Sequence, residues 1–261
     1  MEQKQIKKAA DLLYEAQKKL QPIGPLTEKY PDITVDEAYK VQLINVNRRV
    51  TEGEKIVGKK IGLTSRAMQK MLGVPEPDYG HLLDAMVGEE ELPIKLSSLL
   101  QPKVEAEIAF ILKDELKGPG VTLSKVLQAT EGVIPAFEII DSRVKDWKIK
   151  IQDTIADNAS SAMVILGSEI VPVNNINLKY VGLVLEKNGR IIDTAAGAAV
   201  LGHPALAVAW LANKLAQYDI SLKPGEIILS GSLTSAYEVT GNDVFTATFG
   251  GLGQVKSIFA E

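Results

Sequence analysis

The stretch Val104-Glu105-Ala106-Glu107-Ile108-Ala109-Phe110 decides how we interpret the fold of this chain. Apolar and non-apolar residues alternate along it, which is the period-two pattern of a β-strand with two different faces. Glu105 and Glu107 are therefore expected on one face, about 6.5–7 Å apart along the strand. Two carboxylates this close repel each other, and burying them without compensation is costly. They need a cation, a proton or water.

A third carboxylate stands in a second apolar stretch, Val133-Ile134-Pro135-Ala136-Phe137-Glu138-Ile139-Ile140. Because Glu138 has only apolar neighbours there, we expect a second buried strand that could aim this carboxylate at the first two. Three carboxylates with no cysteine and little histidine nearby suit a hard divalent cation, Mg²⁺ or Mn²⁺. The competing interpretation is the solvated face of an antiparallel strand, which is the commoner origin of two Glu at positions i and i+2. Spacing alone leaves both interpretations open.

Size and composition restrict the class of protein. The chain has 261 residues, a net charge of −4 and no cysteine. This length allows one large domain, or a domain with a small appendage, around a sizeable core. The lack of a basic block disfavours nucleic acid and anionic membranes as partners. The lack of cysteine excludes disulfides, thiolate zinc sites and cysteine nucleophiles and fits a cytoplasmic protein. We expect neither a signal peptide nor a membrane-spanning segment.

The first part of the chain is expected to be mostly helical. Apolar residues at helical spacing predict an amphipathic helix over 3–20. The capping box Thr34-Val35-Asp36-Glu37 predicts a second helix, which ends at Gly53. A short strand over 56–63 and a brief helix over 64–72 follow.

From residue 102 onward the pattern is mostly that of β-strands. The sequence Asn188-Gly189 favours a type I′ hairpin turn. One helix is expected over 205–217, with Pro204 in its first turn, and a long connection over 153–161. The expected strands lie near residues 103–113, 132–140, 162–167, 179–186, 190–196, 226–231, 243–249 and 254–260.

These elements together predict an α+β fold whose sheets surround a site. We expect an N-terminal α-rich appendage over residues 1–70 and a β-rich catalytic body over residues 71–261. The two could also form one continuous domain.

Further polar residues are candidates for chemistry. In Gly58-Lys59-Lys60-Ile61-Gly62, alternation places the two lysines on opposite faces, so Lys60 could face the carboxylates as a proton donor or oxyanion partner. A surface lysine pair is the commoner origin of this pattern. Asp78 lies in a Pro-rich stretch, where aspartate usually serves the turn itself. The segment Asp157-Asn158-Ala159-Ser160-Ser161 fits a polar substrate loop and a turn-and-cap sequence equally well.

Six motifs occur together and in one order along nearly the full length. They are Gly58-Lys59-Lys60-Ile61-Gly62-Leu63-Thr64, Pro77-Asp78-Tyr79-Gly80, Val104-Glu105-Ala106-Glu107-Ile108, Glu138-Ile139-Ile140-Asp141-Ser142-Arg143, Ala156-Asp157-Asn158-Ala159-Ser160 and Leu201-Gly202-His203-Pro204. With them the chain resembles the 2-hydroxypenta-2,4-dienoate hydratases of the meta-cleavage pathway for aromatic compounds. These hydratases belong to the fumarylacetoacetate hydrolase superfamily.

The 4-oxalocrotonate decarboxylases share most of these motifs. Asp78 favours the hydratases, because the decarboxylases usually carry an apolar residue at that position. The segment 143–149 also resembles the hydratases, whereas 186–189 and 196–201 resemble the decarboxylases. We give Asp78 the most weight because it bears on the chemistry.

The resemblance implies a mixed β-sheet roll or sandwich of the fumarylacetoacetate hydrolase catalytic-domain type, with Mg²⁺ or Mn²⁺ as cofactor. The implied reaction adds water to 2-hydroxypenta-2,4-dienoate and gives 4-hydroxy-2-oxopentanoate. The implied roles are metal ligand for Glu105, Glu107 and Glu138, general acid/base for Lys60, its carboxylate partner for Asp78, and substrate contact for Ser160 and the backbone amide of Leu63.

Partners and alternatives follow from the same resemblance. Relatives form homo-oligomers, and the hydratase and decarboxylase of one pathway can associate. One alternative is a decarboxylase that converts 2-oxo-3-hexenedioate to 2-hydroxypenta-2,4-dienoate and CO₂. A second is a non-catalytic partner or scaffold subunit that retains the metal site.

Overall fold

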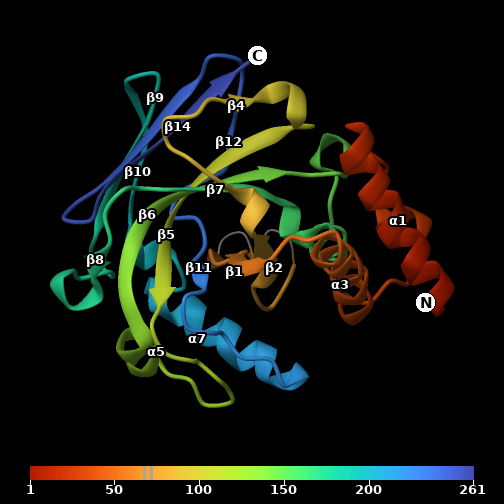
Figure 1. The fold of residues 1–261 in the computed structure, drawn as a ribbon, viewed down its shortest axis with the longest axis horizontal. Helices are drawn as coiled ribbons and strands as arrows, with labels where there is room; N and C mark the ends of the chain where they lie inside the picture. Colours follow the sequence, from red (N-terminus) through yellow and green to blue (C-terminus); the bar gives the residue numbers. More distant parts are fainter. Residues whose placement is uncertain (67–68, 71–72) are drawn as a thin grey trace.

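A computed structural model describes residues 1–261 except 67–68 and 71–72. Within the described residues, the chain forms a nine-stranded sheet, a five-stranded sheet and several helices (Figure 1). This arrangement confirms the α+β prediction. The brief helix expected over 64–72 falls partly outside the described residues.

The N-terminal helices pack together beside the larger sheet (Figure 1). Helix α1 (Gln3–Lys19) buries an apolar stripe, and α3 (Val35–Thr51) begins at the capping box predicted at Thr34. The Thr34 Oγ1 atom accepts a hydrogen bond from the backbone amide of Glu37 at 3.3 Å. Both predicted helices are therefore confirmed, and the short α2 (Leu26–Lys29) lies between them.

The nine-stranded sheet carries the candidate site. Its main path runs in the order β2-β1-β11-β5-β6-β7-β3, while β12 pairs with β5 and β8 pairs with β6. The long antiparallel pair β5–β6 lies at its centre and places Glu105 directly opposite Glu138. The bounds are β1 (Ile56–Gly62), β2 (Asp78–Leu83), β3 (Val87–Gly88), β5 (Pro102–Leu112), β6 (Thr130–Asp141), β7 (Ser161–Leu166), β8 (Val171–Pro172), β11 (Ile227–Leu229) and β12 (Tyr237–Glu238).

The five-stranded sheet packs against the larger one through β14 and β13, which contact β6. Its order is β10-β9-β13-β14-β4, with β4 (Ile94–Lys95), β9 (Gly182–Lys187), β10 (Arg190–Ala196), β13 (Val244–Phe249) and β14 (Gly253–Ala260).

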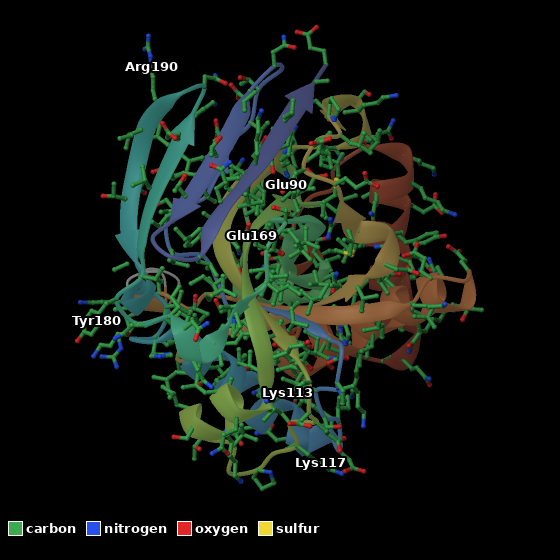
Figure 2. The ribbon with its side chains drawn as sticks, turned by 60° about the vertical axis from the view of Figure 1, so that its left-hand side comes forward. Glu90, Lys113, Lys117, Glu169, Tyr180 and Arg190 are labelled. Atoms are coloured by element: carbon green, nitrogen blue, oxygen red, sulfur yellow. The ribbon has the colours of Figure 1, made fainter. Side chains whose placement is uncertain are left out.

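The predicted hairpin joins β9 to β10. Asn188 and Gly189 have φ of 54° and 72°, as a type I′ turn requires. Figure 2 shows Arg190 at this turn, at the opposite end of the molecule from Lys113 and Lys117.

Three further α-helices lie in the described part of the chain. Helix α7 (Pro204–Leu215) confirms the predicted late helix and packs against α5 (Leu123–Ala129) (Figure 1). The prediction of a connection over 153–161 is wrong at its start, because α6 (Ile151–Ala156) occupies part of it. The Asp153 carboxylate accepts hydrogen bonds from Thr27 at 3.0 and 2.7 Å. A helix this short depends on such tertiary contacts, which a local pattern does not reveal.

A second difference concerns Asp78, which the sequence placed in a turn. It is the first residue of β2, because the backbone after Pro77 pairs with β1 in an antiparallel arrangement that begins with Asp78 opposite Gly62. Strand β1 also pairs in parallel with β11. A domain boundary near residue 70 stays a prediction. Among the described residues, no helix is long and apolar enough to cross a membrane.

Candidate metal centre and acid–base site

Three carboxylates from neighbouring strands meet at one point. Glu105 and Glu107 point from the same face of β5, and Glu138 comes from the adjacent strand β6. One carboxylate oxygen of each lies within 4.8 Å of the others. Glu107 and Glu138 are buried, while Glu105 is half-buried. The structure thus brings together the three residues that the strand patterns singled out, and their role as metal ligands stays a prediction.

The carboxylates of this cluster are only partly compensated. Burial raises the pKa of Glu105 to about 7, and the charges of Glu138 and Asp78 act in the same direction. Burial, with the charges of Glu138 and Glu105, also raises the pKa of Glu107. Each of these groups therefore resists ionisation unless positive charge is close by.

The oxygen donors of the cluster fit a hard divalent cation. Oε2 of Glu107 accepts a hydrogen bond from the backbone amide of Gly231 at 2.8 Å. Oε1 of Glu107 and Oε1 of Glu138 have no hydrogen-bond partner among the described residues. Buried polar atoms without partners are rare, and carboxylate oxygens in this number are the ligands that Mg²⁺ and Mn²⁺ prefer.

Lys60 lies beside the cluster on β1. Its Nζ atom is 3.1 Å from Oε2 of Glu138 and donates a hydrogen bond to the carbonyl oxygen of Ala159 at 3.0 Å. Burial disfavours its charge, but the carboxylates, led by Glu138 and Asp78, outweigh burial and raise the pKa of Lys60. Lys60 is therefore a buried ammonium within a group of acids.

Asp78 completes this acid–base pair from β2. It is buried and lies opposite Gly62 of β1. A Cβ atom at Gly62 would lie 2.1 Å from Oδ1 of Asp78 and 3.5 Å from Nζ of Lys60, so both groups converge over this glycine. Burial raises the pKa of Asp78, while the charge of Lys60 opposes that shift. Glycine at position 62 is what leaves room for the carboxylate.

Ser160 and Leu63 both adopt unusual backbone conformations at the site. The consecutive residues Asn158, Ala159 and Ser160 have φ of 54°, 50° and 55°, and Leu63 has φ of 56°. Positive φ is unfavourable for such residues and persists only where the surroundings enforce it. The Ser160 hydroxyl lies 3.4 Å from Oγ1 of Thr154. The polar segment is thus both a tight turn and part of the cavity wall.

Two adjoining cavities, of 350 and 590 Å³, open onto these residues. The smaller is lined by Lys60, Asp78 and Ser160, and the larger by Glu107. Glu105 and Leu63 line both. Of the seven candidate residues only Glu138 lies behind the walls, in contact with Lys60. The two cavities share part of their lining, so Glu105, Glu107 and the acid–base pair face neighbouring spaces.

The sequence interpretation missed two residues of the cavity walls. Lys103 lines both cavities and stands two residues before Glu105 on β5, so strand alternation could have found it. Its Nζ atom lies 5.0 Å from the ring centroid of Trp147, which lines the smaller cavity. Nothing in the local pattern marked Trp147, because it follows a strand and makes its contacts through the tertiary fold.

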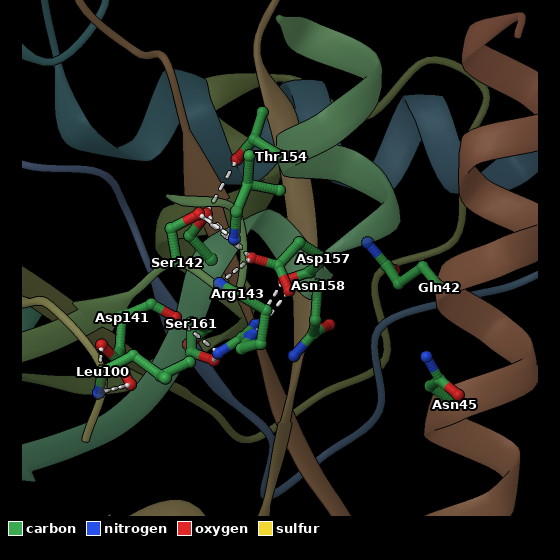
Figure 3. A network of polar contacts seen from close by, with 12 residues as sticks. Gln42, Asn45, Leu100, Asp141, Ser142, Arg143, Thr154, Asp157, Asn158 and Ser161 are labelled. Carbon is green, nitrogen blue, oxygen red and sulfur yellow. Dashed lines mark hydrogen bonds and ion pairs between the residues drawn. The ribbon is translucent and has the colours of Figure 1, made fainter. Parts of the chain in front are cut away.

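A buried ion pair supports the turn (Figure 3). The Arg143 guanidinium forms an ion pair with the Asp157 carboxylate, which also accepts a hydrogen bond from the Arg143 backbone amide at 2.9 Å. Burial raises the pKa of Asp157 to about 6, although Arg143 opposes the shift. Nη1 of Arg143 donates to the carbonyl oxygen of Asp141 at 2.7 Å, so this pair connects the turn to the end of β6.

The fold and the carboxylate cluster define the class of protein, and the comparisons agree. The chain belongs to the fumarylacetoacetate hydrolase family, because the family's C-terminal domain profile, "Fumarylacetoacetate (FAA) hydrolase C-terminal", matches residues 65–259. The resemblance found in the sequence is thereby confirmed.

Particular relatives narrow the comparison to hydratases. The chain is 50% identical over 223 residues to a 2-hydroxypent-2,4-dienoate hydratase of Pseudomonas putida, covering 85% of this chain and 100% of the relative. It is 45% identical over 251 residues to a 2-hydroxyhexa-2,4-dienoate hydratase of Comamonas testosteroni, covering 95% of each.

Among solved structures, the chain is similar to the 4-oxalocrotonate decarboxylase of Pseudomonas putida G7 complexed with magnesium and adipate. The TM-score is 0.96 at 39% identity, over 99% of this chain and 98% of the other. The fold is therefore common to hydratases and decarboxylases and does not by itself separate the two activities.

Proposed function

We propose that this chain is a hydratase, an enzyme of the lyase class, that adds water to 2-hydroxypenta-2,4-dienoate and gives 4-hydroxy-2-oxopentanoate. The reaction belongs to the meta-cleavage degradation of aromatic compounds. Its hydratase relatives support this proposal. The observation that carries it is the buried pair Lys60 and Asp78, which converges over Gly62 beside three carboxylates.

The ion of this site is a divalent cation, and we propose Mg²⁺ or Mn²⁺ held by Glu105, Glu107 and Glu138. When bound, the cation supplies Lewis-acid polarisation of the substrate's 2-oxygen and carboxylate. The arrangement of oxygen donors in the structure supports this assignment. The related decarboxylase complexed with magnesium supports it independently.

The residues of the acid–base pair have complementary tasks. The reaction removes the proton of the 2-hydroxyl group and adds a proton at C5, which gives an α,β-unsaturated ketone. Water then adds at C4, and a proton is delivered to C3. The Lys60 ammonium stabilises negative charge that develops on the 2-oxygen. The pair of Lys60 and Asp78 transfers the protons, with Asp78 poised by burial to take up and release one.

The remaining walls hold the substrate. We propose that the Ser160 hydroxyl and the Leu63 backbone amide form hydrogen bonds with the substrate. Both residues line the smaller cavity. Apolar side chains of that cavity exclude water from the hydrocarbon end of the dienoate and strengthen the electrostatic interactions beside it. These side chains are Ile140, Trp147 and Ile149.

The second candidate is the decarboxylase reaction, which the solved decarboxylase structure favours. Asp78 favours the hydratase instead, because it lines the smaller cavity together with Lys60 and supplies a second group for the proton transfers that we propose. A non-catalytic scaffold has no need for Lys60, Asp78 and the carboxylate cluster together.

The deciding experiment uses metal-stripped protein, with Mg²⁺ or Mn²⁺ added back, on two substrates. We expect metal-dependent loss of the dienol absorbance of 2-hydroxypenta-2,4-dienoate, with 4-hydroxy-2-oxopentanoate as product. CO₂ release from 2-oxo-3-hexenedioate without hydration of the dienoate would identify the decarboxylase. Cation binding without turnover of either substrate would support the scaffold.

Partners and location are part of the same proposal. We propose a homo-oligomer, with a pathway decarboxylase as its associating enzyme and the cytoplasm as its location. Light scattering of the purified protein tests the first, and repeating it with an added 4-oxalocrotonate decarboxylase tests the second. The mass of one chain in the first sample would reject the homo-oligomer, and a mixture of the two separate species in the second would reject the association.

A further inference from the structure

One side chain joins the left-handed turn Asn158–Ser160 to strand β2. Oδ1 of Asn158 accepts a hydrogen bond from the backbone amide of His81 at 2.8 Å. Nδ2 of the same side chain donates to the carbonyl oxygen of His81 at 2.9 Å. Figure 3 shows Asn158 next to Asp157 and Arg143, at the point where the turn leaves α6. The Asn158 amide thus binds β2 much as a neighbouring strand would.

Asparagine suits this position for two separate reasons. It tolerates a φ of 54° better than most residues, and its amide can donate and accept at the same time. The approach is close, because a Cβ atom at Gly80 would lie 2.5 Å from the carbonyl oxygen of Asn158. The turn and β2 therefore touch along their backbones, and the Asn158 side chain fixes their relative position.

Both elements that Asn158 joins carry parts of the proposed acid–base pair. The carbonyl oxygen of Ala159, the next residue, accepts the hydrogen bond from Lys60. On the other side, His81 stands three residues after Asp78 on β2. The Ser160 hydroxyl follows in the same turn. The Ala159 carbonyl oxygen orients Lys60. If the turn moved relative to β2, this acceptor would therefore move away from Asp78.

Other contacts support these elements without making this connection. Nε2 of Gln42 in α3 donates to the carbonyl oxygens of Tyr79 and Ile155 at 3.0 and 2.8 Å. The Arg143–Asp157 pair secures the start of the turn. Among the described residues beyond Asp157, Arg143 reaches only the carbonyl oxygen of Ser161, at 3.3 Å, and Gln42 forms a hydrogen bond with neither Asn158 nor Ala159. Neither residue joins the segment that carries the Ala159 carbonyl to β2. That task falls to Asn158.

We infer that Asn158 is a positioning residue for the proposed reaction: its amide fixes the Ala159 carbonyl and the Ser160 hydroxyl relative to Asp78. This inference rests on the proposed function for its catalytic consequence. It also makes a structural statement, that the contact between Lys60 and Ala159 depends on the Asn158 amide.

The test compares Asn158→Gly with a matched control. Glycine keeps the positive φ at no steric cost and removes only the amide. The control is Asn213→Ala in α7, since Asn213 makes the same two bonds, both 2.9 Å, with the backbone of Val121 away from the site. We expect Asn158→Gly to lower kcat about 10- to 100-fold, as small displacements at an active site do. KM should rise, because the Ser160 hydroxyl moves with the turn, and the affinity for Mn²⁺ should stay near the wild-type value. Asn213→Ala should leave kcat and KM unchanged.

Crystal structures of both variants provide the second measurement. We expect the Lys60 Nζ to Ala159 oxygen distance to exceed hydrogen-bond length in Asn158→Gly and to stay at 3.0 Å in Asn213→Ala. An unchanged distance in Asn158→Gly, or an equal loss of kcat in both variants, would overturn the inference. Inactivity of the wild-type protein on both substrates would reject the proposed function instead, and the structural comparison would still decide the inference.

Discussion

Lys59 and Lys60 are neighbours on β1, yet the two faces of this strand differ in charge balance. On one face, Nζ of Lys59 lies 2.7 Å from Oε1 of Glu226, and the other Glu226 oxygen accepts a hydrogen bond from the Lys223 backbone amide. On the other face, Lys60 lies among the carboxylates of Glu138, Asp78, Glu105 and Glu107. The Lys59 face is a balanced pair. The Lys60 face has four carboxyl groups for one lysine, an arrangement that a bound cation would compensate.

Replacing each lysine should show the largest contrast. We expect Lys60→Met to lower kcat about 10³-fold, within the range that general acid–base groups contribute. Lys59→Met should keep kcat and lose about 1–3 kcal/mol of stability, because it leaves Glu226 without its partner. Steady-state hydration of 2-hydroxypenta-2,4-dienoate at saturating Mg²⁺, with urea unfolding alongside, measures both. Equal losses of kcat would contradict the distinction between the two faces.

Removing one carboxylate from each face should separate cation binding from ion pairing. We expect Glu138→Gln to weaken Mn²⁺ binding about 100-fold, since even the hydrogen-bond partners of metal ligands contribute about 10- to 100-fold. Glu226→Gln should leave Mn²⁺ affinity unchanged, because Glu226 pairs with Lys59 on the opposite face. Titration calorimetry of the metal-stripped proteins gives both constants. Wild-type affinity in Glu138→Gln would remove this residue from the ligand set.

Two glycines of β1 offer a smaller and more local contrast. A Cβ atom at Gly62 would meet the movable carboxylate of Asp78, whereas one at Gly58 would lie 2.0 Å from the backbone oxygen of Ile227 in β11. We expect Gly62→Ala to lower kcat about 10-fold through displacement of Asp78, with little loss of stability. Gly58→Ala should mainly destabilise the protein. Kinetics and urea unfolding of the pair test this, and a stable, inactive Gly58→Ala protein would count against it.

The last contrast concerns pH on the Lys59 side. Burial, and next the charge of Lys59, lower the pKa of His81 to about 4. The unfolded chain takes up this proton near pH 6.5, whereas the folded chain takes it up only near pH 4. The stability contributed by neutral His81 is therefore fully present above pH 6.5. It is lost as the pH falls towards 4, by up to about 1.4 kcal/mol per pH unit.

Urea unfolding at pH 7.5 and 5, with EDTA present, measures this dependence. The free energy of unfolding of His81→Gln should change less between these pH values than that of the wild-type protein. His203→Gln serves as the control, because His203 is only half-buried. A wild-type pH dependence in His81→Gln would show that His81 is not the titrating group.

Part of this architecture is visible in the sequence because it depends on local pattern. Alternation along β5 places Glu105 and Glu107 on one face, the apolar run of β6 places Glu138 on a buried strand, and the capping box marks the start of α3. Spacing alone left open whether the β5 face is solvated. Alternation also places Lys59 and Lys60 on opposite faces. The family motifs add Asp78, which spacing alone would have left in a turn.

The remaining features depend on contacts between distant segments. Gln42 reaches Ile155, and Asn158 reaches His81, 77 positions away in the sequence. Such contacts leave no periodic signal, because each needs only one side chain of the right length. The short helix α6 escaped prediction for a related reason, since Asp153 binds Thr27 far along the chain.

The place of β1 in the sheet has a practical consequence for anyone who trims this protein. The recognised family domain begins at residue 65, but β1 ends at Gly62 and lies between β2 and β11. A fragment cut at the family boundary would lose Lys60. It would also separate β2 from β11, because β1 is the strand that pairs with both of them. Expression libraries and chimaeras should therefore keep the segment from α1 through β1 together with residues 65–259.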